Sequence, residues 1–347
     1  MIIDNNIILE KNIGKGTFSE IYLATKKGSV DKYATKQYKR ESIEGTEYIN
    51  HLKNEIIYIQ QLNHKNIIKY DSIIKTKQHF YLIYEYCNGG NLSTILNNYQ
   101  MKYGHPFSQD VVQYLMKQIM KGLKYIHNKE LIHGDLKLNS ILVHFNTEKG
   151  KEELDMMKTV LKISHFKYMN KNKNILEDSF VNIKNKKKKN YNKNDKSKDI
   201  YNLGIMCYKM IFGNFDYNSN NYEKLINEIE EGKYKYPIAL SKEILSFMKN
   251  MLRNDSHKRL EINELCNHNF LTKNINDLES IDKKKDNEKL HLCIYCLTNN
   301  SQIIFSPCGH KCTCYNCYIY FKKKGTLIEC PVCRKIIVSF VEKVFEV

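Results

Sequence analysis

The sequence predicts an α+β protein in two parts, a larger mixed domain followed by a small domain held together by metal ions. With 347 residues, of which 42% are hydrophobic, the chain is long enough for two domains and can bury a sizeable core. Strand-like segments dominate roughly the first 86 residues, and helical periodicity dominates the next 185 or so. Near the C-terminus, eight cysteine and histidine residues form four closely spaced pairs.

The first part opens with a strand-like run that leads into a glycine-rich loop. Ile7 to Leu9 are apolar, and Gly14 and Gly16 follow within a short stretch that ends on another strand-like segment. Glycines let backbone amides approach a phosphate closely. Alone the motif is a weak signal, because Ser19 stands where a Gly-x-Gly-x-x-Gly pattern has its third glycine.

The elements that follow strengthen this signal. An alternating strand contains Lys36, and a segment with apolar residues at helical spacing contains Glu55. A further strand, from Phe80 to Cys87, runs into a glycine pair. After it, Ser108 can cap a helix whose apolar residues recur every three or four positions, namely Leu115, Ile119, Leu123 and Ile126.

That helix leads into a loop, residues 132–143, that reads IHGDLKLNSILV, and here the chain resembles the eukaryotic protein kinases up to about residue 271. The resemblance implies a bilobal fold, with an N-lobe over residues 1–86 and a C-lobe over 87–271. Lys36 would contact the nucleotide phosphates and pair with Glu55. Asp135 would stand at the catalytic base and Lys137 at its companion lysine.

In the same family the strand that ends at Cys87 forms the wall of the nucleotide pocket. The resemblance implies that Glu85 to Cys87 face the adenine through their backbone and that Tyr84 closes the back of the pocket. Gly14, Gly16 and Ser19 would cover the phosphates.

The chain departs from the kinase pattern where metal ions bind. Ser140 replaces the metal-binding asparagine, and the Asp-Phe-Gly motif reads His165-Phe166-Lys167. Magnesium prefers oxygen ligands, so an imidazole is a poor substitute. Phosphoryl transfer depends on positioning and metal charge. We therefore expect a pseudokinase that binds ATP weakly, without requiring magnesium, although an active kinase with divergent metal binding stays open.

Two polar segments follow in which we expect no packed structure. Residues 182–198 are lysine-rich and lack the family's Ala-Pro-Glu triplet, which predicts a solvated loop. A nuclear-import-like patch or an anionic docking surface are the alternatives for this loop. Residues 272–290 read as a flexible linker. The net charge of +17 could indicate nucleic acid, but the basic run has few aromatic residues for stacking, so we do not expect it.

The four ligand pairs predict zinc sites. A two-residue gap lets both sulfurs of a Cys-x-x-Cys pair reach one ion, and eight ligands make two tetrahedral sites. No secretory signal or membrane-spanning run is seen, so we expect an intracellular location, mainly cytoplasmic, with the nucleus as an alternative. Because that environment disfavours disulfides, we expect no disulfide framework. The ligands are Cys293, Cys296, Cys308, His310, Cys314, Cys317, Cys330 and Cys333.

Their order resembles a RING finger, here over residues 291–347. The resemblance implies a cross-brace in which the first and third pairs share one structural zinc and the second and fourth pairs share the other. The segment before Cys317 and the β-branched tail resemble RINGs of the inhibitor-of-apoptosis type, which dimerise through an aromatic tail residue, here Phe345. Ile294 and Pro331 would bind a ubiquitin-conjugating enzyme, and Arg334 would bridge it to ubiquitin.

Together these resemblances predict a RING-type ubiquitin ligase whose kinase-like domain recruits or regulates a protein substrate. Its partners would be a ubiquitin-conjugating enzyme, ubiquitin and a second copy of the RING. An active serine/threonine kinase and a non-enzymatic scaffold are the alternatives.

Overall fold

A computed structural model describes most of the larger domain and the centre of the smaller one. The described residues are 2–3, 6–16, 18–166, 170–171, 195–213, 222–231, 240–273, 293, 295, 301–306, 311–323, 330 and 336–342. The chain forms two compact units. The first comprises Met1–Ile95, Tyr114–Met206 and Asp255–Cys266, and the second comprises Leu96–Gln113, Cys207–Asn254 and Asn267–Val347.

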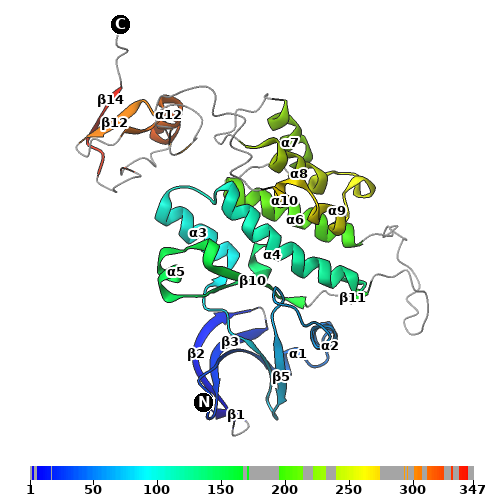
Figure 1. The fold of residues 1–347 in the computed structure, drawn as a ribbon. Coiled ribbons are helices and arrows are strands. Elements are labelled where there is room, and N and C mark those ends of the chain that lie inside the picture. Colours follow the sequence, from blue (N-terminus) through cyan, green and yellow to red (C-terminus); the bar gives the residue numbers. More distant parts are fainter. Residues whose placement is uncertain are drawn as a thin grey trace. The chain divides into compact units, whose positions relative to one another are not determined.

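The first unit contains an antiparallel six-stranded sheet in the order β1-β2-β3-β4-β6-β5, which Figure 1 shows as a curled layer. Its strands are β1 (Ile2–Ile3), β2 (Ile7–Lys15), β3 (Ser19–Lys26), β4 (Lys32–Lys39), β5 (Tyr70–Lys75) and β6 (His79–Glu85). The short helix α1 (Arg40–Ile43) and the longer α2 (Glu47–Ile59) lie between β4 and β5 in sequence.

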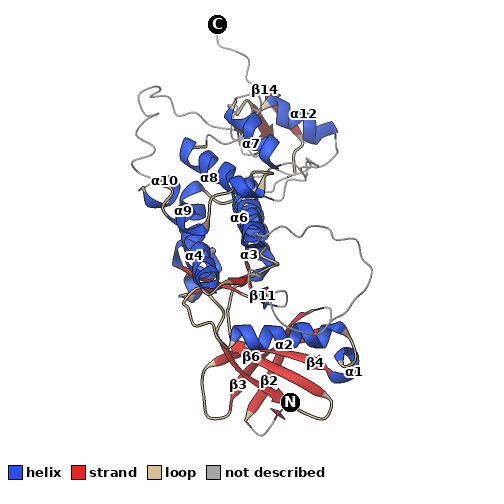
Figure 2. Cartoon of the chain, turned by 90° about the vertical axis from the view of Figure 1, so that its right-hand side faces the viewer, coloured by secondary structure: helices blue, strands red, loops and turns tan. Residues whose placement is uncertain are grey.

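Helix α2 is the helix predicted around Glu55, and it lies alongside the sheet (Figure 2). The Thr46 hydroxyl caps it by accepting a hydrogen bond of 3.2 Å from the Tyr48 amide. Leu52, Glu55 and Ile59 are all buried, which fits the spacing of one helix face. Glu55 therefore points toward the sheet and the core rather than toward solvent.

The remainder of this unit holds short strands around the predicted catalytic loop. They form two small sheets, β10-β9-β7 and β11-β8. The elements of this region, with the helices that enter and leave it, are β7 (Gly90–Asn91), α3 (Leu92–Tyr103), α4 (Gln109–Asn128), β8 (Leu131–Ile132), η1 (Leu138–Ser140), β9 (Ile141–Phe145), α5 (Glu148–Glu153), η2 (Met156–Lys158), β10 (Thr159–Ile163) and β11 (Asn170–Lys171).

Helix α4 is the helix predicted after Ser108. Its predicted apolar positions Leu115, Ile119, Leu123 and Ile126 are all fully buried. Further helices complete the mixed domain, namely α6 (Asp195–Phe212), α7 (Tyr222–Glu230), α8 (Lys242–Leu252), η4 (Ser256–Lys258), α9 (Ile262–Cys266) and α10 (Asn269–Thr272). The predicted α+β class is confirmed, and among the described helices none is long and apolar enough to cross a bilayer.

In the described residues of the small C-terminal domain, three antiparallel strands in the order β13-β12-β14 are accompanied by one helix. These are β12 (Ile303–Ser306), β13 (Lys311–Thr313), α12 (Tyr315–Lys323) and β14 (Ser339–Glu342). Phe305 is fully buried and pairs with Phe340 across β12 and β14. The tail after the last ligand thus contributes an edge strand to this sheet, as its β-branched pattern predicts.

Candidate functional site

The predicted pair of Lys36 on β4 and Glu55 on α2 is formed. The Lys36 ammonium lies 2.8 Å from Glu55 Oε1 and 5.1 Å from the centre of the Tyr84 ring. Tyr84 donates its hydroxyl hydrogen to the same Glu55 oxygen, at 2.9 Å. Glu55 is only 3% exposed, so this carboxylate is buried with two partners.

These partners keep the Glu55 carboxylate ionised. Burial alone would raise its pKa, but the charge of Lys36 and the hydrogen bonds from Lys36 and Tyr84 outweigh it, and the pKa is lowered. For Tyr84, burial and the neighbouring carboxylate raise the pKa well above its usual range. The lysine that would meet a nucleotide phosphate is therefore held by a fixed negative charge.

The glycine-rich loop connects β2 to β3. The Gly16 amide donates a hydrogen bond of 2.7 Å to the Ser19 carbonyl, and the Gly14 amide donates one of 3.1 Å to the Asn12 side chain. A β-carbon on Gly16 would lie 2.7 Å from the Ser19 hydroxyl, so a side chain there would displace the Ser19 side chain. Phe18, at its tip, packs against Tyr48 of α2 with the ring centres 4.7 Å apart and the rings tilted by 54°.

The strand that would face adenine ends at Glu85 and leads to Cys87. Glu85 accepts a hydrogen bond of 2.6 Å from the Lys69 amide and lies 2.7 Å from the Lys162 ammonium. Its side chain is therefore committed to the protein, which fits a contact to adenine through backbone groups. The Cys87 thiol is buried, and burial raises its pKa to about 12, so it stays protonated.

The catalytic loop is held by a buried aspartate of α6. The two carboxylate oxygens of Asp199 accept hydrogen bonds from the His133 and Gly134 amides, at 2.9 and 3.0 Å. Gly134 replaces the family's arginine and has φ +83°, a conformation that costs a glycine little. Asp135 lies 2.7 Å from Lys137, so these two predicted residues are brought together.

Ser140 and His165, at the two positions that bind metal in the family, interact with other groups of the protein instead. The Ser140 hydroxyl donates to the Lys137 carbonyl at 2.8 Å and accepts from the Lys137 amide at 2.9 Å. Ser164 donates its hydroxyl to the Ser140 carbonyl and lies 2.7 Å from His165 Nδ1. His165 adopts the left-handed conformation, φ +68°, which strains a residue with a β-carbon.

His165 is a neutral ring at neutral pH. Solvent reaches the imidazole, but protein atoms surround much of it. This burial, followed by the charge of Lys36, lowers the pKa of His165 to about 4. Within the described residues, no group of three His, Cys, Asp or Glu ligand atoms gathers at His165. A neutral imidazole and a bonded hydroxyl do not make a magnesium site, so the residues present do not fit that ion.

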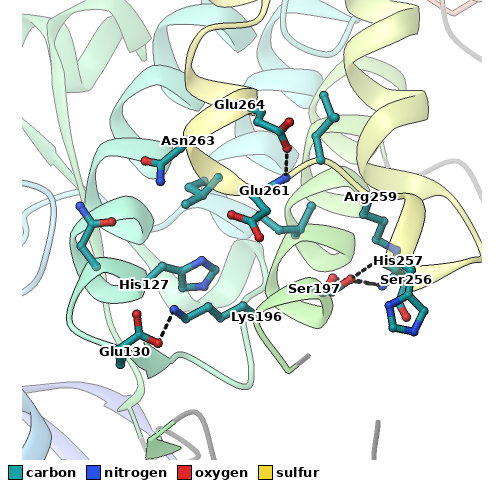
Figure 3. Close-up of a pocket in the computed structure, with 14 residues that line it drawn as sticks. His127, Glu130, Lys196, Ser197, Ser256, His257, Arg259, Glu261, Asn263 and Glu264 are labelled. Atoms are coloured by element: carbon teal, nitrogen blue, oxygen red, sulfur yellow. Dashed lines mark hydrogen bonds and ion pairs between the residues drawn. The ribbon is translucent and has the colours of Figure 1, made fainter. Parts of the chain in front are cut away.

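A cavity of about 610 Å³ lies where α4 ends and α6 begins (Figure 3). Lys196 pairs with Glu130 at 2.8 Å across it, and the Arg259 guanidinium donates to the Ser197 carbonyl at 3.0 Å. Arg259 also lies over the Tyr201 ring at 4.7 Å.

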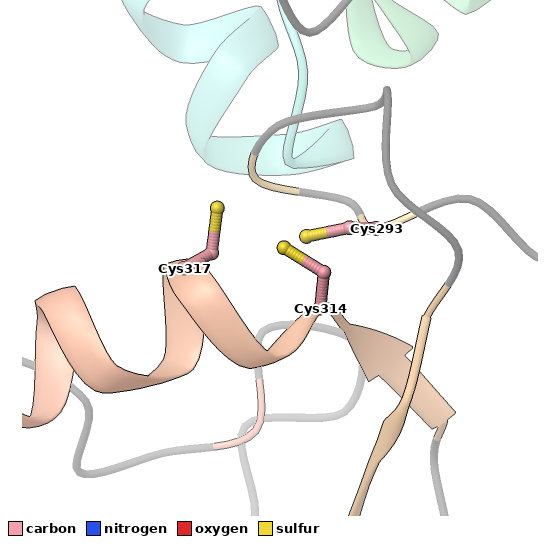
Figure 4. A group of neighbouring side chains, drawn as sticks. All are labelled: Cys293, Cys314 and Cys317. Atoms are coloured by element: carbon pink, nitrogen blue, oxygen red, sulfur yellow. The ribbon is translucent and has the colours of Figure 1, made fainter.

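The C-terminal domain brings three predicted zinc ligands together. The sulfurs of Cys293, Cys314 and Cys317 all lie within 4.8 Å of one another (Figure 4). Four sulfurs about 2.3 Å from one zinc ion would be separated by roughly 3.8 Å, so the cluster fits that ion closely. Their elements explain the grouping, because Cys314 immediately precedes α12 and Cys317 lies in its first turn.

Two further cysteines of this domain lie in its apolar core. Cys330, a predicted ligand, and Cys312, which belongs to no predicted pair, are buried with Ile303, Phe305 and Tyr318. The other predicted site residues lie outside the described residues, namely Cys296, Cys308, His310, Cys333, Ile294, Pro331, Arg334 and Phe345. Residues 195–198, which the sequence analysis assigned to a solvated loop, instead begin α6, and Ser197 is buried. The rest of that segment, 182–194, and the linker from 274 to 290 lie outside the described residues.

The structure adds site residues that the sequence reasoning missed. Ser164 bridges Ser140 and His165, and Phe18 with Tyr48 ties the glycine-rich loop to α2. Their only sequence signal was position, since Ser164 directly precedes the altered motif and Tyr48 is the second residue of α2. His127, 3.0 Å from Asp199, gave no signal because a histidine near a helix end is common.

Two family models match the chain. The one described as protein kinase domain matches residues 7–271, and the one described as zinc finger, C3HC4 type (RING finger), matches residues 289–340. These matches confirm both resemblances, and the RING finger with its cysteine cluster indicates zinc binding.

Among curated proteins, serine/threonine-protein kinase atg1 of Dictyostelium discoideum is 26% identical over 284 residues, which are 78% of this chain and 40% of that protein. Serine/threonine-protein kinase 33 of Mus musculus is 24% identical over 270 residues, 76% of this chain and 54% of that protein. MAP3K epsilon protein kinase 2 of Arabidopsis thaliana is 37% identical over 152 residues, 44% of this chain and 11% of that protein. The chain thus spans about half or less of each of these relatives.

Proposed function

Because the chain belongs to the protein kinase family and carries a C3HC4-type RING finger, we propose that it is a RING-type ubiquitin ligase with a catalytically impaired kinase-like domain. The kinase-like domain recruits or regulates the substrate. The observation that carries the impairment is the bonding of Ser140 and His165 to the protein itself. The cluster of Cys293, Cys314 and Cys317 supports the RING.

The RING contributes binding and positioning rather than covalent chemistry. Cys293, Cys314 and Cys317, with Cys296 as their fourth partner, would hold one structural zinc, and Cys308, His310, Cys330 and Cys333 would hold the other. A closed four-ligand site gives zinc no open position for catalysis. Ile294 and Pro331 supply the apolar surface for the conjugating enzyme, and Arg334 restrains ubiquitin so that its thioester is attacked in a reactive pose.

We propose that the kinase-like site still accepts a nucleotide without magnesium. The Lys36–Glu55 pair is formed, and the glycine-rich loop is closed by the bond between Gly16 and Ser19. The backbone after Glu85 is left to face adenine. No aspartate stands at position 165 to hold a metal, so a bound nucleotide would keep its phosphates close to Lys36 and Lys137.

A second candidate function, an active serine/threonine kinase, is favoured by that same ion pair and by the names of the relatives. It would require magnesium to be held by groups other than residues 140 and 165. Phosphate transfer from labelled ATP to the chain or to a test substrate, lost on Asp135→Asn, would establish it. A non-enzymatic scaffold would show neither activity.

The test of the ligase is ubiquitin discharge. The purified, zinc-loaded chain is mixed with a panel of charged conjugating enzymes, and loss of the thioester is followed over time. Stimulated discharge that disappears on Arg334→Ala, with zinc content unchanged, supports the ligase. No stimulation with any conjugating enzyme would refute it. We also propose an intracellular, cytoplasmic location, since thiolate ligands stay reduced there.

A further inference from the structure

Helix α4 carries a row of three lysines opposite its apolar side. Lys117, Lys121 and Lys124 are separated by four and three residues, and side chains at these spacings are neighbours on a helix surface. Lys121 is exposed, and the other two are half-buried. The only acidic residue in this helix is Asp110, near its start. We call these three lysines the α4 basic face.

The α4 basic face is a cost to the folded chain. Like charges three and four residues apart on a helix repel each other. Burial and then the charge of Lys121 lower the pKa of Lys117, which shows that the ammonium groups feel one another. In the described part of the chain, Lys121 and Lys124 form no ion pair.

Two segments distant in sequence border the same positive charge. The pKa of His64, before β5, is lowered first by burial and then by Lys121 and Lys162. For Cys266, at the end of α9, burial raises the pKa while Lys124 and Lys121 oppose it. Lys121 therefore lies within electrostatic reach of both segments, and all of these residues belong to the first compact unit.

The spacing of the lysines suits an acidic polypeptide. Lys117 and Lys121 are about 6 Å apart along the helix axis. Alternate residues of an extended chain point the same way about 6.6 Å apart, so carboxylates at every second position can meet successive lysines.

Single-stranded nucleic acid fits this surface less well, because it needs free aromatic faces for its bases. Tyr125, the aromatic neighbour of Lys124, already stacks on His64 at 5.2 Å and lies beneath the Lys129 ammonium at 5.3 Å. Its hydroxyl accepts a hydrogen bond from the Asn63 amide.

We propose that the α4 basic face binds an acidic segment of a partner protein, and that this partner is a substrate of the ligase. The binding site stands on the lysines alone. The identification of this partner as a substrate rests on the proposed function. It predicts that the ligase modifies proteins with an exposed acidic stretch.

The test compares two triple variants of the zinc-loaded full chain. Lys117, Lys121 and Lys124 are each changed to Gln in one. The matched control changes Lys149, Lys151 and Lys158 to Gln, an equal loss of charge at lysines that already pair with Glu153, Glu148 and Asp155. Binding of a fluorescein-labelled decaglutamate peptide is measured by anisotropy at low salt. Unlabelled ten-nucleotide oligouridylate serves as competitor.

We expect the α4 variant to bind the peptide about tenfold more weakly and the control to stay within about twofold of the unchanged chain. Equal weakening of both variants would overturn the proposal, since the affinity would then come from overall charge. Undetectable peptide binding by the unchanged chain would do the same. Tighter binding of oligouridylate, lost in the α4 variant, would assign the face to nucleic acid instead.

The substrate assignment has its own readout. A test protein with a decaglutamate tail is ubiquitinated in parallel with an untailed copy. We expect the tail to increase modification by the unchanged chain and not by the α4 variant. An equal increase with both chains would refute the assignment. If no conjugating enzyme is discharged at all, the ligase proposal fails, while the peptide binding stands by itself.

Discussion

Tyr84 donates its hydroxyl hydrogen to the Glu55 oxygen that also holds Lys36, and this hydrogen bond is 2.9 Å long. Tyr84 is on β6 and Glu55 on α2, so the bond ties the helix to the sheet independently of any nucleotide. Burial of all but a few per cent of both residues makes the bond expensive to lose.

Changing Tyr84→Phe should lower the free energy of unfolding by about 2 kcal/mol, because a hydrogen bond to a buried carboxylate is lost while the ring stays. Chemical denaturation of the full chain measures this change. Tyrosine fluorescence or circular dichroism reports the unfolding of residues 1–273.

Tyr70→Phe is the matched control. Its ring meets that of Tyr84 edge-on at 5.8 Å, but its hydroxyl is buried with no hydrogen-bond partner in the described structure. Gln60 lies near that hydroxyl without reaching hydrogen-bond geometry. We expect Tyr70→Phe to be neutral or slightly stabilising. Equal losses in the two variants would show that the bond to Glu55 contributes nothing specific.

ATP should raise the melting temperature of the chain by the same amount with magnesium as with a chelator. The reason is that His165 and Ser140 cannot hold the ion. The double variant Ser140→Asn with His165→Asp restores the family ligands, and its shift should become larger with magnesium. Autophosphorylation by the unchanged chain that vanishes on Asp135→Asn would contradict the expectation of an impaired site.

The His165 ring should make stability sensitive to mild acid. Its pKa is lowered to about 4 in the fold, against an ordinary value near 6.5, so both states are neutral above pH 7. As the pH falls from 6.5 toward 4, the unfolded chain takes up a proton that the folded chain refuses, and stability is lost. Because solvent reaches the ring, we expect a loss of only about 1 kcal/mol.

The measurement is the change in melting temperature between pH 7 and pH 5 for the unchanged chain and for His165→Asn. The unchanged chain should lose more. The other histidines contribute equally to both proteins. An equal fall in melting temperature for both would therefore mean that the pKa of His165 is not lowered.

Elemental analysis should find two zinc ions per chain, and removing them should unfold the RING, since metal binding supplies much of its folding energy. Cys317→Ala removes a clustered ligand and should lower the zinc content. Cys312→Ala removes a buried thiol two residues from Cys314 that is not a predicted ligand, and should leave two ions bound. Loss of zinc from both variants would place Cys312 among the ligands.

Arg334→Ala should slow ubiquitin discharge without altering zinc content, and Ile294→Ala should weaken binding of the conjugating enzyme. Phe345→Ala should give monomers with lower activity, because the tail of one RING would complete the other's binding surface. A chain that is monomeric from the start, and as active after loss of residues 344–347, would show that the dimer comparison does not hold.

Local pattern predicted much of this molecule. The apolar spacing of α4 followed from periodicity, and the pairing of Lys36 with Glu55 was implied by the resemblance to protein kinases; the structure has both. The resemblance to RING fingers likewise implied that Cys293 would share a site with Cys314 and Cys317, which the structure brings together.

Contacts made by tertiary packing could not be predicted. Ser164 reaches Ser140 because β10 lies beside β9, and no pattern within either strand indicates that placement. The same hydroxyl also lies beside its sequence neighbour His165. The row of lysines on α4 is visible in the sequence, yet its closeness to His64 and Cys266 depends on segments about 200 residues apart.

The strand order of the RING sheet bears on how the chain is made. β12 lies between β13 and β14, and residues 339–342 of β14 follow every zinc ligand in the sequence. During synthesis the kinase-like domain is completed first, and early domains fold as units. One edge of β12, the central strand of the RING sheet, then stays unpaired until β14 has been synthesised. The sheet therefore closes late, after all the zinc ligands have been translated, and until then its unpaired edge can pair with a strand of another chain.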